Sequence, residues 1–581
     1  MNNYLTDISN ILVIGCGGAG LRAAIEVKKN NLSVKVLGKR PKSDSHTVLA
    51  AGGINASFGN LDHCDSWEEH FADTYLEGYK VGDPDLIEIM AKKAIDAVTE
   101  IDNWGADFEK LENGKFNQRY FGAHTYRRTC FSGDYTGQSI LNTLLNKSKT
   151  YGIPIYDDEY VSDLLVEDKK CFGAISINLT SGEKTIHLAD AVILCTGGHT
   201  KIWKISSSRK QENTGDGLFL GLKAGCQLID MEMVQFHPTG MIMPEEMAGT
   251  LVTEAVRGEG GKLFNGLGER FMINYDHERM ELSTRDKVAI ANYTEIKEGR
   301  TSPNGGVFLD ISHKDKDFII SKIPKIYRQF LEYQMLDISE KPMEVSPTAH
   351  YSMGGIRVNA LDHSTNIKGL YAAGEVAGGL HGANRLGGNS LAEILIFGKI
   401  VGKASSDYSR NLKSQNRSQV VIKQAIENIE KTIKKGNQIA ISLQNQLSQL
   451  MWNYCGVLKE EETLNQGLHK LKDLQNLSQD IDVRIYENNQ QDLINTLNLQ
   501  SSLITAEATI ISAKNRKESR GAHQRSDFKE TDNTKEFNNI INLQNHTLNL
   551  KEINTTPLRT DLKDFLLKKS RASEGKSKLL E

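Results

Sequence analysis

Cysteine is scarce in this chain, and the few cysteines are widely spaced. The 581 residues contain seven cysteines, and no two of them form a CxxC pair. Zinc and iron–sulfur sites need thiolates at close spacing, so the sequence predicts no metal or cluster site of its own. Dispersed cysteines instead suit small buried apolar positions in a reducing compartment. They are Cys16, Cys64, Cys130, Cys171, Cys195, Cys226 and Cys455.

Long apolar runs and a surplus of one charge are also missing. The longest apolar runs, such as Ala191–Cys195, fall far short of the ~18 residues that cross a bilayer, and the N-terminus has no long apolar signal core. We therefore expect a chain that stays inside the cell. The 74 acidic and 70 basic residues nearly cancel, which argues against a nucleic-acid partner. A length of 581 residues exceeds what one core supports, so about two to four domains are expected.

A nucleotide-binding turn lies near the N-terminus. Residues 11–15 (ILVIG) are typical of a buried strand, and a Gly-x-Gly-x-x-Gly loop follows at once and opens an amphipathic helix. Such glycines allow a tight turn and the close approach of a pyrophosphate to the helix N-terminus. The next strand, Ser33–Leu37, leads to Lys39 and Arg40, so the acidic residue typical of an NAD site is absent. The loop glycines are Gly15, Gly17, Gly18 and Gly20.

The stretch Asp44–Asn60 (DSHTVLAAGGINASFGN) predicts contact with a flat ligand. Gly52 and Gly53 lack Cβ atoms, so the backbone there can press against a planar ring. His46 stands six residues before this pair in a Ser-His-Thr triplet, where an imidazole nitrogen could attack an electrophilic ring methyl and form a tether. A lone histidine before a glycine pair is more often a turn or cap residue, so the tether depends on the rest of the pattern.

The middle of the chain predicts a second domain set into the first. A strand-and-glycine unit, Ala191–Gly198, and a glycine turn, Asn213–Gly217, still follow the strand and helix alternation. From about Val234 that alternation stops, and it returns only at Gly369, which indicates an inserted domain. The motif segments of this region and of the return are Gln235–Gly240, Leu251–Gly261, Leu282–Lys287, Ser346–Gly355, Gly369–Glu375 and His381–Leu391.

Beyond Lys403 the composition shifts to Asn, Gln, Lys and Leu, with apolar residues at helical spacing. Three such stripes predict a three-helix domain with an aliphatic core. The basic residues at the end of the chain indicate a solvated tail. The stripes are Ile422, Ile426, Ile429 and Ile433, then Leu443, Leu447, Leu450 and Met451, then Leu464, Leu468 and Leu471, and the tail carries Lys568, Lys569, Arg571, Lys576 and Lys578.

Together with Glu518–Phe528 (ESRGAHQRSDF), these motifs resemble the flavoprotein subunit of succinate dehydrogenase and fumarate reductase. The resemblance covers residues 8–530. It implies an α/β fold, in which a Rossmann-like FAD-binding domain carries an inserted α+β capping domain and is followed by a C-terminal three-helix domain. The implied boundaries are 1–233 and 346–403 for the FAD-binding domain, 234–345 for the capping domain, 404–510 for the helical domain, and 511–581 for a C-terminal segment and tail.

The resemblance implies FAD as the cofactor, attached covalently through His46 of the Ser-His-Thr motif. The family also has a lysine at the position of Lys39. One departure is Ala51, where the family usually has glutamine, so a hydrogen bond to the flavin edge is expected to be missing. The implied cofactor-binding residues are Gly15, Gly17, Gly18, Gly20, Lys39, His46, Thr47, Ala51, Gly52, Gly53, Thr196, Gly197, Gly198, Asp216, Glu375, Ser390 and Leu391.

Oxidation of succinate removes a hydride from one methylene and a proton from its neighbour, so a site must clamp both carboxylates. Arginine, histidine and threonine suit this task, because a guanidinium grips a carboxylate with two hydrogen bonds while imidazole and hydroxyl donors fix its rotation. By resemblance, His237 and Thr253 hold one carboxylate of a small dicarboxylate substrate, whereas His350 and Arg385 hold the other.

The family assigns proton transfer to an arginine that matches Arg285, fed through Glu254 and Arg257. A guanidinium with a pKa above ~12 is a poor base, so Arg285 can act only as a transient conduit, with Glu254 favouring its cationic form. In an alternative, Arg285 only polarises the substrate and a carboxylate moves the proton.

Two other functions remain open at this stage. L-aspartate oxidase is the nearest relative of the family, and Asp310–His313 (DISH) resembles it, but that enzyme lacks the histidine at position 46. It also has a glutamate, facing the substrate ammonium, where this chain has Phe121. The third possibility is a non-catalytic, flavin-bound assembly subunit, which loss of Arg285 or Arg385 would indicate, and both are present.

The resemblance also implies partners. Because the chain has no cluster ligands, an iron–sulfur subunit is expected to pass electrons between the flavin and a quinone. That subunit would be joined to membrane anchor subunits, which would place this chain on the cytoplasmic face of a membrane. Succinate oxidation and fumarate reduction use the same residues, so the sequence does not decide the direction.

Overall fold

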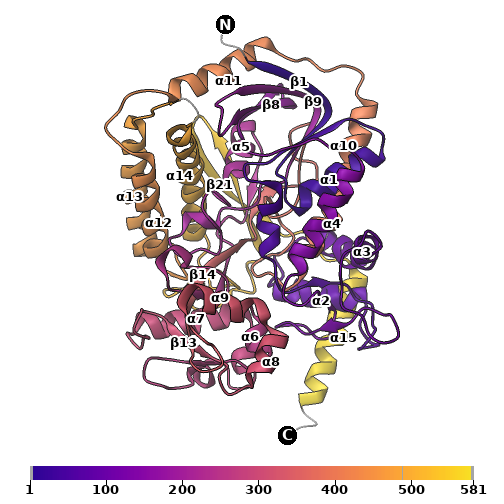
Figure 1. Cartoon of the computed structure of the whole chain (residues 1–581), viewed down its shortest axis with the longest axis vertical. Helices are drawn as coiled ribbons and strands as arrows, with labels where there is room; N and C mark the ends of the chain where they lie inside the picture. Colours follow the sequence, from indigo (N-terminus) through magenta and orange to yellow (C-terminus); the bar gives the residue numbers. More distant parts are fainter. Residues whose placement is uncertain (1–3, 487–488, 578–581) are drawn as a thin grey trace.

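The computed structural model describes residues 4–486 and 489–577, with side chains up to residue 570. Its central element is a seven-stranded sheet in the order β6-β2-β1-β9-β8-β7, with β16 also paired to β9 (Figure 1). β1 pairs in parallel with β2 and β9, whereas β7, β8 and β9 form an antiparallel extension. The strands are β1 (Leu5–Ile14), β2 (Val34–Leu37), β6 (Ile155–Tyr156), β7 (Glu159–Glu167), β8 (Lys170–Asn178), β9 (Lys184–Leu194) and β16 (Leu370–Ala372).

The sequence of β1 explains why this sheet is covered on both faces. Ile11 and Val13 belong to one hydrophobic cluster, and Leu12 and Ile14 belong to another, as expected of a parallel strand buried on both sides. Six helices, α1, α2, α3, α4, α10 and α15 (Thr560–Ser577), contribute to the first cluster. α5 with a five-stranded sheet, β17-β15-β10-β20-β21, contributes to the second. The bounds are α1 (Gly18–Lys29), α2 (Trp67–Glu77), α3 (Pro84–Asn103), α4 (Thr136–Thr150), α10 (Asn389–Asn411), α5 (Asp216–Ala224), β10 (Leu228–Ile229), β15 (Gly355–Arg357), β17 (Ala377–Gly378), β20 (Phe537–Gln544) and β21 (Thr547–Asn554).

A separate antiparallel sheet, β11-β14-β13-β12, occupies the region where the strand and helix alternation stops. It has its own hydrophobic cluster and lies at the bottom of Figure 1. We call this part the β11–β14 unit. The sequence-based domain boundaries stay a prediction. The elements are β11 (Val234–Met241), β12 (Lys262–Phe264), β13 (Val307–Asp310), β14 (Met343–Ser352), α6 (Ala255–Gly258), α7 (Arg285–Lys297), α8 (Lys316–Lys322) and α9 (Pro324–Gln334).

The C-terminal helices differ in detail from the three predicted ones. The three helices that pack against one another are α12 (Ala440–Tyr454), α13 (Glu461–Leu477) and α14 (Gln491–Asn515), whereas α11 (Gln419–Thr432) packs on β7. The stripe in α11 is real, but it faces a sheet. α14 was missed because it is buried on nearly all sides and therefore has no single apolar stripe.

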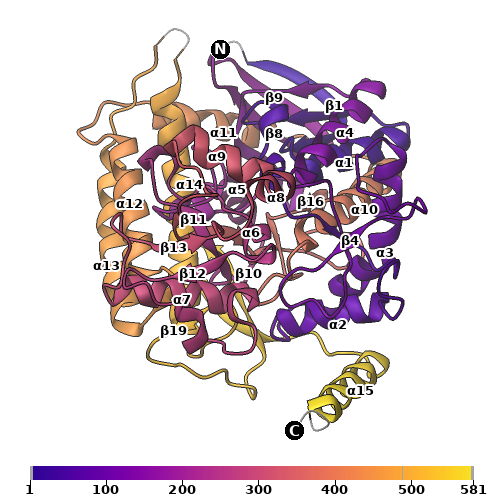
Figure 2. The same ribbon diagram turned by 60° about the horizontal axis from the view of Figure 1, so that its bottom comes forward.

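Of the predicted solvated tail, the described side chains contradict the prediction at Lys569, which forms ion pairs. β20 and β21 form a hairpin that pairs with β10, and α15 (Thr560–Ser577) lies beside α2 (Figure 2). Lys569 contacts the carboxylates of Glu69 and Asp73, at 2.5 and 2.7 Å. Lys568 is exposed, the side chains of Arg571 and Lys576 are not described, and Lys578 lies outside the described residues.

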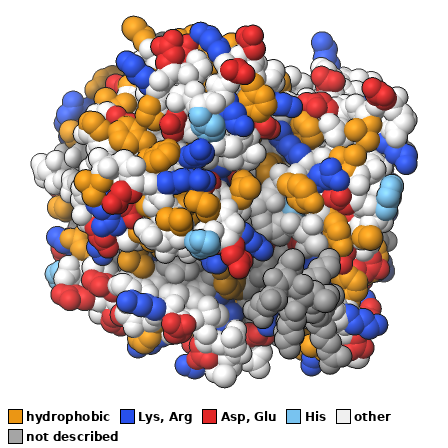
Figure 3. Space-filling model, turned by 90° about the horizontal axis from the view of Figure 1, so that it is seen from below, with side chains coloured by type: hydrophobic (Ala, Val, Ile, Leu, Met, Phe, Trp, Pro, Cys, Tyr) orange, Lys and Arg blue, Asp and Glu red, His pale blue; other side chains and the backbone are white. Residues whose placement is uncertain are grey.

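Several global features bear on the sequence predictions. Six of the seven cysteines are buried, as expected, whereas Cys64 is exposed. Within residues 4–486 and 489–577, no helix is long and apolar enough to cross a membrane, and no cluster of His, Cys, Asp and Glu is arranged to hold a metal. Acidic and basic side chains are interspersed on the face shown in Figure 3. The remaining short strands are β3 (Ile54–Asn55), β4 (Gln118–Arg119), β5 (Thr129–Cys130), β18 (Leu458–Lys459) and β19 (Gln524–Arg525).

Candidate active site

A cavity of about 530 Å³ opens at the carboxyl ends of β1, β2 and β9, the edge where open α/β sheets bind ligands. It continues to residues of the β11–β14 unit, so two sheets far apart in sequence contribute to one cavity. All but three of the predicted site residues line it. The exceptions are Gly20, Gly198 and Arg257.

The loop between β1 and α1 has the geometry that its glycines predict. Gly15 has φ +112°, and a Cβ there would lie 2.0 Å from the carbonyl oxygen of Cys195. Gly20 is needed for packing, because its Cβ would lie 1.9 Å from the carbonyl oxygen of Gly15. The backbone N–H of Gly18 donates to Thr47 Oγ1 at 3.0 Å, which joins the loop to the predicted flavin stretch.

Lys39 is held near the end of β2 by groups from two other parts of the chain. Its Nζ donates to Asp216 Oδ2 at 2.6 Å, Thr214 Oγ1 at 3.1 Å and Asn498 Oδ1 at 2.6 Å. Asn498 lies on α14, so the helical region supports a lysine that lines the cavity. Lys39 and Asp216, each expected to bind the cofactor, are in contact, whereas no sequence motif marks Asn498.

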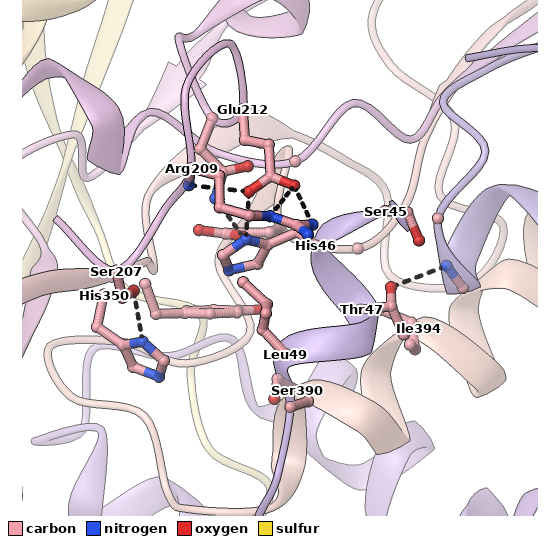
Figure 4. Close-up of a pocket in the computed structure, with 18 of the residues that line it drawn as sticks. Ser45, His46, Thr47, Leu49, Ser207, Arg209, Glu212, His350, Ser390 and Ile394 are labelled. Atoms are coloured by element: carbon pink, nitrogen blue, oxygen red, sulfur yellow. Dashed lines mark hydrogen bonds and ion pairs between the residues drawn. The ribbon is translucent and has the colours of Figure 1, made fainter. Parts of the chain in front are cut away.

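His46 lies in a short 3₁₀ helix, and its Nδ1 is 3.2 Å from Glu212 Oε2 (Figure 4). Burial lowers the pKa of His46, but the hydrogen bond and charge of Glu212 outweigh it, so the net pKa is raised. Arg209 donates to the same carboxylate. Because Nδ1 of His46 donates to the Glu212 carboxylate, the lone pair of the neutral ring is on Nε2. Neither Glu212 nor Arg209 belongs to a motif that sequence reasoning singled out.

The adjacent glycines at the cavity wall accommodate an aromatic ring of the chain itself. A Cβ on Gly52 would lie 2.4 Å from Phe121 Cζ, so Phe121 packs directly against this backbone. Arg119 donates to the carbonyl oxygens of Gly52 and Gly133 and lies near the ring of Phe121. The other predicted cofactor residues that line the cavity are Ala51, Gly53, Thr196, Gly197, Glu375, Ser390 and Leu391.

Two arginines approach the opposite part of the cavity and share one acceptor. Gln235 Oε1 accepts from Arg285 Nη1 at 3.3 Å and from Arg385 Nη2 at 3.1 Å. Arg385 is 4 % exposed, and burial together with the charge of Arg285 lowers its pKa to about 10. Two guanidiniums held this close form a strong site for anions.

Two histidines and a threonine complete this part of the cavity. The rings of His237 and His350 are 5.4 Å apart, edge to face, and Thr253 lines the cavity with them. Burial lowers the pKa of both histidines well below the ordinary value, with Arg285 adding to the effect at His237 and His237 adding to it at His350. Both rings are therefore neutral hydrogen-bonding groups. Ser207 Oγ lies 3.0 Å from His350 Nδ1 and orients that ring (Figure 4).

Only two members of the expected proton relay touch each other. Glu254 Oε2 accepts from Arg285 Nε at 2.7 Å. Burial raises the pKa of Glu254, but the charges of Arg285 and Arg257 lower it more, so the net pKa is lowered. Arg257 donates to the Glu281 carbonyl oxygen at 2.5 Å, and among the described residues it forms no ion pair with Glu254.

The cavity fits FAD on several independent features. The glycine loop and the N-terminus of α1 suit a pyrophosphate. Buried polar atoms at the cavity, Thr196 Oγ1, Ser45 Oγ and Arg385 Nε, have no hydrogen-bond partner among the described residues. They suit a ligand rich in polar atoms.

The aspartate-oxidase-like segment Asp310–His313 is not part of this site. None of its four residues lines the cavity, and it forms a turn at the end of β13. Both diagnostic arginines, Arg285 and Arg385, do line it.

Comparisons with known proteins agree with this geometry. Residues 10–391 match a family model described as an FAD binding domain, and residues 444–571 match one described as the fumarate reductase flavoprotein C-terminal region. A relative in Methanothermobacter marburgensis, named as part of a fumarate reductase (CoM/CoB), is 42% identical over 90% of this chain and 95% of its own length. The succinate dehydrogenase flavoprotein subunit of Rickettsia felis is 36% identical over 90% of this chain and 91% of its own length.

Solved structures give the same result. Escherichia coli quinol fumarate reductase superposes with a TM-score of 0.90 at 32% identity, covering 96% of this chain and 98% of that one. Sdh1 of Mycobacterium smegmatis, in complex with UQ1, gives 0.87 at 36% identity, covering 96% of both chains. The predicted α/β fold, with its FAD-binding part and C-terminal helices, is thereby confirmed, and the cofactor is FAD. The chain belongs to the family of succinate dehydrogenase and fumarate reductase flavoprotein subunits, FAD-dependent enzymes that interconvert succinate and fumarate.

Proposed function

We propose that the cavity holds a four-carbon dicarboxylate between two sets of side chains, with His237 and Thr253 on one carboxylate and His350 and Arg385 on the other. The observation that carries this proposal is the pair of guanidiniums, Arg285 and Arg385, that Gln235 holds in the cavity of the glycine loop. Neutral imidazoles and a hydroxyl supply the remaining donors. Bound FAD supplies hydride chemistry, and the protein fixes the substrate beside it.

Arg285 is the residue proposed to hand a proton to, or take one from, the substrate carbon. Glu254, 2.7 Å away, stabilises its charged form. Arg257 would act without contact, through its charge, which lowers the pKa of both Glu254 and His237. The relay of three residues is thus proposed as a contact pair with a third member that acts through its charge.

A dye assay tests this function. Holoenzyme with reduced viologen as donor should reduce fumarate. Arg285→Gln should leave binding of a dicarboxylate inhibitor such as malonate nearly intact but abolish turnover, because its proposed role is in proton transfer. Arg357→Gln, a matched change at an exposed arginine outside the cavity, should have no effect. An Arg285→Gln enzyme with more than a tenth of wild-type turnover would contradict the assignment.

His46 is proposed to carry the flavin covalently through Nε2. The contact of Nδ1 with Glu212 supports this, because it leaves the other nitrogen free to attack. Protonated imidazole has no such lone pair, and the pKa of His46 is raised, so attachment should become faster as the pH rises through that value.

The tether can be tested directly. After denaturation and acid precipitation of protein assembled with its partners, yellow flavin should stay in the wild-type pellet. In His46→Ser it should move to the supernatant, although FAD still binds before denaturation. Free flavin from the wild-type protein would show that the tether is absent.

The proposed electron partner is an iron–sulfur subunit joined to membrane anchors, which would hold this chain at the cytoplasmic face of a membrane. Quinone is one candidate for the compound that exchanges electrons with this complex, since the E. coli and M. smegmatis relatives are described with quinol and UQ1. A second candidate rests on the M. marburgensis relative, whose name specifies CoM/CoB and whose identity of 42% exceeds the 36% of the Rickettsia relative. The test is to purify the native complex, identify its subunits by mass, and offer it menaquinol, or coenzyme M with coenzyme B, as electron donor for fumarate.

A further inference from the structure

A series of hydrogen-bonded side chains leads from Arg285 and Arg385 to the last residue of α2. Gln235 is fully buried, and its Oε1 accepts from both Arg285 and Arg385. Its Nε2 donates to Asn384 Oδ1 at 2.8 Å and to the Arg385 carbonyl oxygen at 3.0 Å. All four of these residues are joined through one amide.

Asn384 continues the chain toward two acids. Its Nδ2 donates to Glu77 Oε1 at 2.7 Å and to Asp286 Oδ1 at 3.2 Å. Glu77 is the last residue of α2, and Asp286 is the second residue of α7. The amide of Asn384 therefore lies between two carboxylates that come from different parts of the fold.

The orientation of the Asn384 and Gln235 amides follows from which of the neighbouring groups donate and which accept hydrogen bonds. Glu77 Oε1 and Asp286 Oδ1 both accept from Asn384 Nδ2, so both N–H groups of Asn384 are committed to the two acids. Its oxygen must then face Gln235, and Gln235 must present its own oxygen to the guanidiniums. The reversed amide would place an NH₂ group against Arg285 and Arg385, which are donors only.

We infer that Glu77 is a positioning residue for the reaction, acting through Asn384 and Gln235 to set the spacing of Arg285 and Arg385. This rests on the proposed roles of the two arginines. Asp286 shares the work, but it also accepts from Tyr79 at 2.9 Å and lies in the first turn of α7, so its loss would disturb more than the amide chain. Burial and the charge of Asp286 raise the pKa of Glu77, consistent with two acids crowded around one amide.

A double-mutant cycle tests this inference on the FAD-loaded holoenzyme. Glu77→Gln keeps the shape but can donate as well as accept, so it no longer fixes the amides. It should lower kcat/KM for fumarate roughly tenfold, the scale of one hydrogen bond to a charged group. Gln235→Met removes the shared acceptor and should cost at least as much. If Glu77 acts through Gln235, adding Glu77→Gln to Gln235→Met should cost almost nothing more.

A matched control and a second measurement complete the test. Glu68→Gln, in the first turn of the same helix, should leave kcat/KM, FAD content and Tm unchanged. Malonate binding, followed by flavin absorbance, reports the placement of Arg385 even in a variant too slow to assay, and should weaken in Glu77→Gln and Gln235→Met but no further in the double variant.

The failures are distinguishable. An inactive wild-type enzyme would overturn the proposed function. Two results with an active wild-type enzyme would overturn the inference alone. In one, kcat/KM of Glu77→Gln stays within twofold of wild type. In the other, the losses in kcat/KM from Glu77→Gln and Gln235→Met multiply in the double variant.

Discussion

Arg385 is a buried cation, and the guanidinium of Arg285 shares its hydrogen-bond acceptor, Gln235. Its lowered pKa of about 10 reports burial first and the charge of Arg285 second. A substrate carboxylate would relieve both effects. Arg385→Lys keeps the charge but loses the pair of hydrogen bonds that a guanidinium donates to a carboxylate. Transition-state binding, measured from kcat/KM, should therefore weaken by on the order of 2–4 kcal/mol. Turnover within threefold of wild type would remove Arg385 from the substrate site.

We expect Phe121 to favour succinate over L-aspartate, a substrate of similar size. Its ring packs on Gly52 and is only 8 % exposed, so position 121 offers an amino group an aromatic ring in place of a carboxylate. An unpaired buried charge costs several kcal/mol, and L-aspartate should therefore be a very poor substrate compared with succinate. Dye reduction by both compounds on one preparation measures this. Comparable rates would contradict the proposed preference.

At the scale of elements, α15 is attached to α2 near the segment that carries Phe121. Lys569 bonds to Asp73, which also accepts from Thr125 and from the buried Arg128. The pKa of Asp73 is lowered to about 2, because these cations outweigh the effect of its burial.

Reversing the charge at position 569 tests this attachment. Lys569→Glu should lower the free energy of unfolding by about 1–2 kcal/mol, because it adds a third acid to Glu69 and Asp73. Lys568→Glu, an identical change at the exposed neighbour, is the control. Equal Tm values for the two variants, measured by calorimetry, would show that α15 is not anchored through Lys569.

Elements with a local signal were predictable from sequence, and those defined by long-range packing were not. The loop from Gly15 to Gly20 and the stripe of α12 follow from neighbouring residues. The burial of α14 on nearly all sides depends on helices and strands that no local period reveals. The same holds in the site, where His237 and Arg385 stand in motifs, whereas Glu212 and Asn498 are recognisable only by the partners that folding gives them.

At the scale of the whole molecule, buried neutral histidines predict sensitivity to acid. Burial, as the largest effect, lowers the pKa of His199 to about 3 and those of His187 and His363 to about 4. In the unfolded chain these side chains titrate near ~6.5, so below that pH the unfolded state binds protons that the folded state does not. The contribution of these neutral histidines to the free energy of unfolding is therefore fully present above about pH 6.5 and should be lost as the pH drops toward 4. His46, with a raised pKa, acts in the opposite sense.

Calorimetry across this range tests the prediction. Tm should be level above pH 7 and decline steadily from pH 6.5 to pH 4.5. His199→Gln should lower Tm at neutral pH, because it disturbs the bonds to Ser352 and Thr509, but the decline with acid should be shallower. A wild-type Tm that is constant from pH 6.5 to pH 4.5 would show that these histidines are not kept neutral.

The partner of Lys39 on α14 has a consequence for biosynthesis. Lys39 and Asn498 are separated by 459 residues, so Lys39, which lines the FAD cavity, lacks this hydrogen-bond partner until nearly the whole chain has left the ribosome. At about 5–20 residues per second, that wait is roughly half a minute to a minute and a half. The glycine loop emerges first but has no finished pocket around it. A ribosome-bound chain stalled before α14 should therefore retain FAD less well than the full-length chain, because Lys39 lacks Asn498.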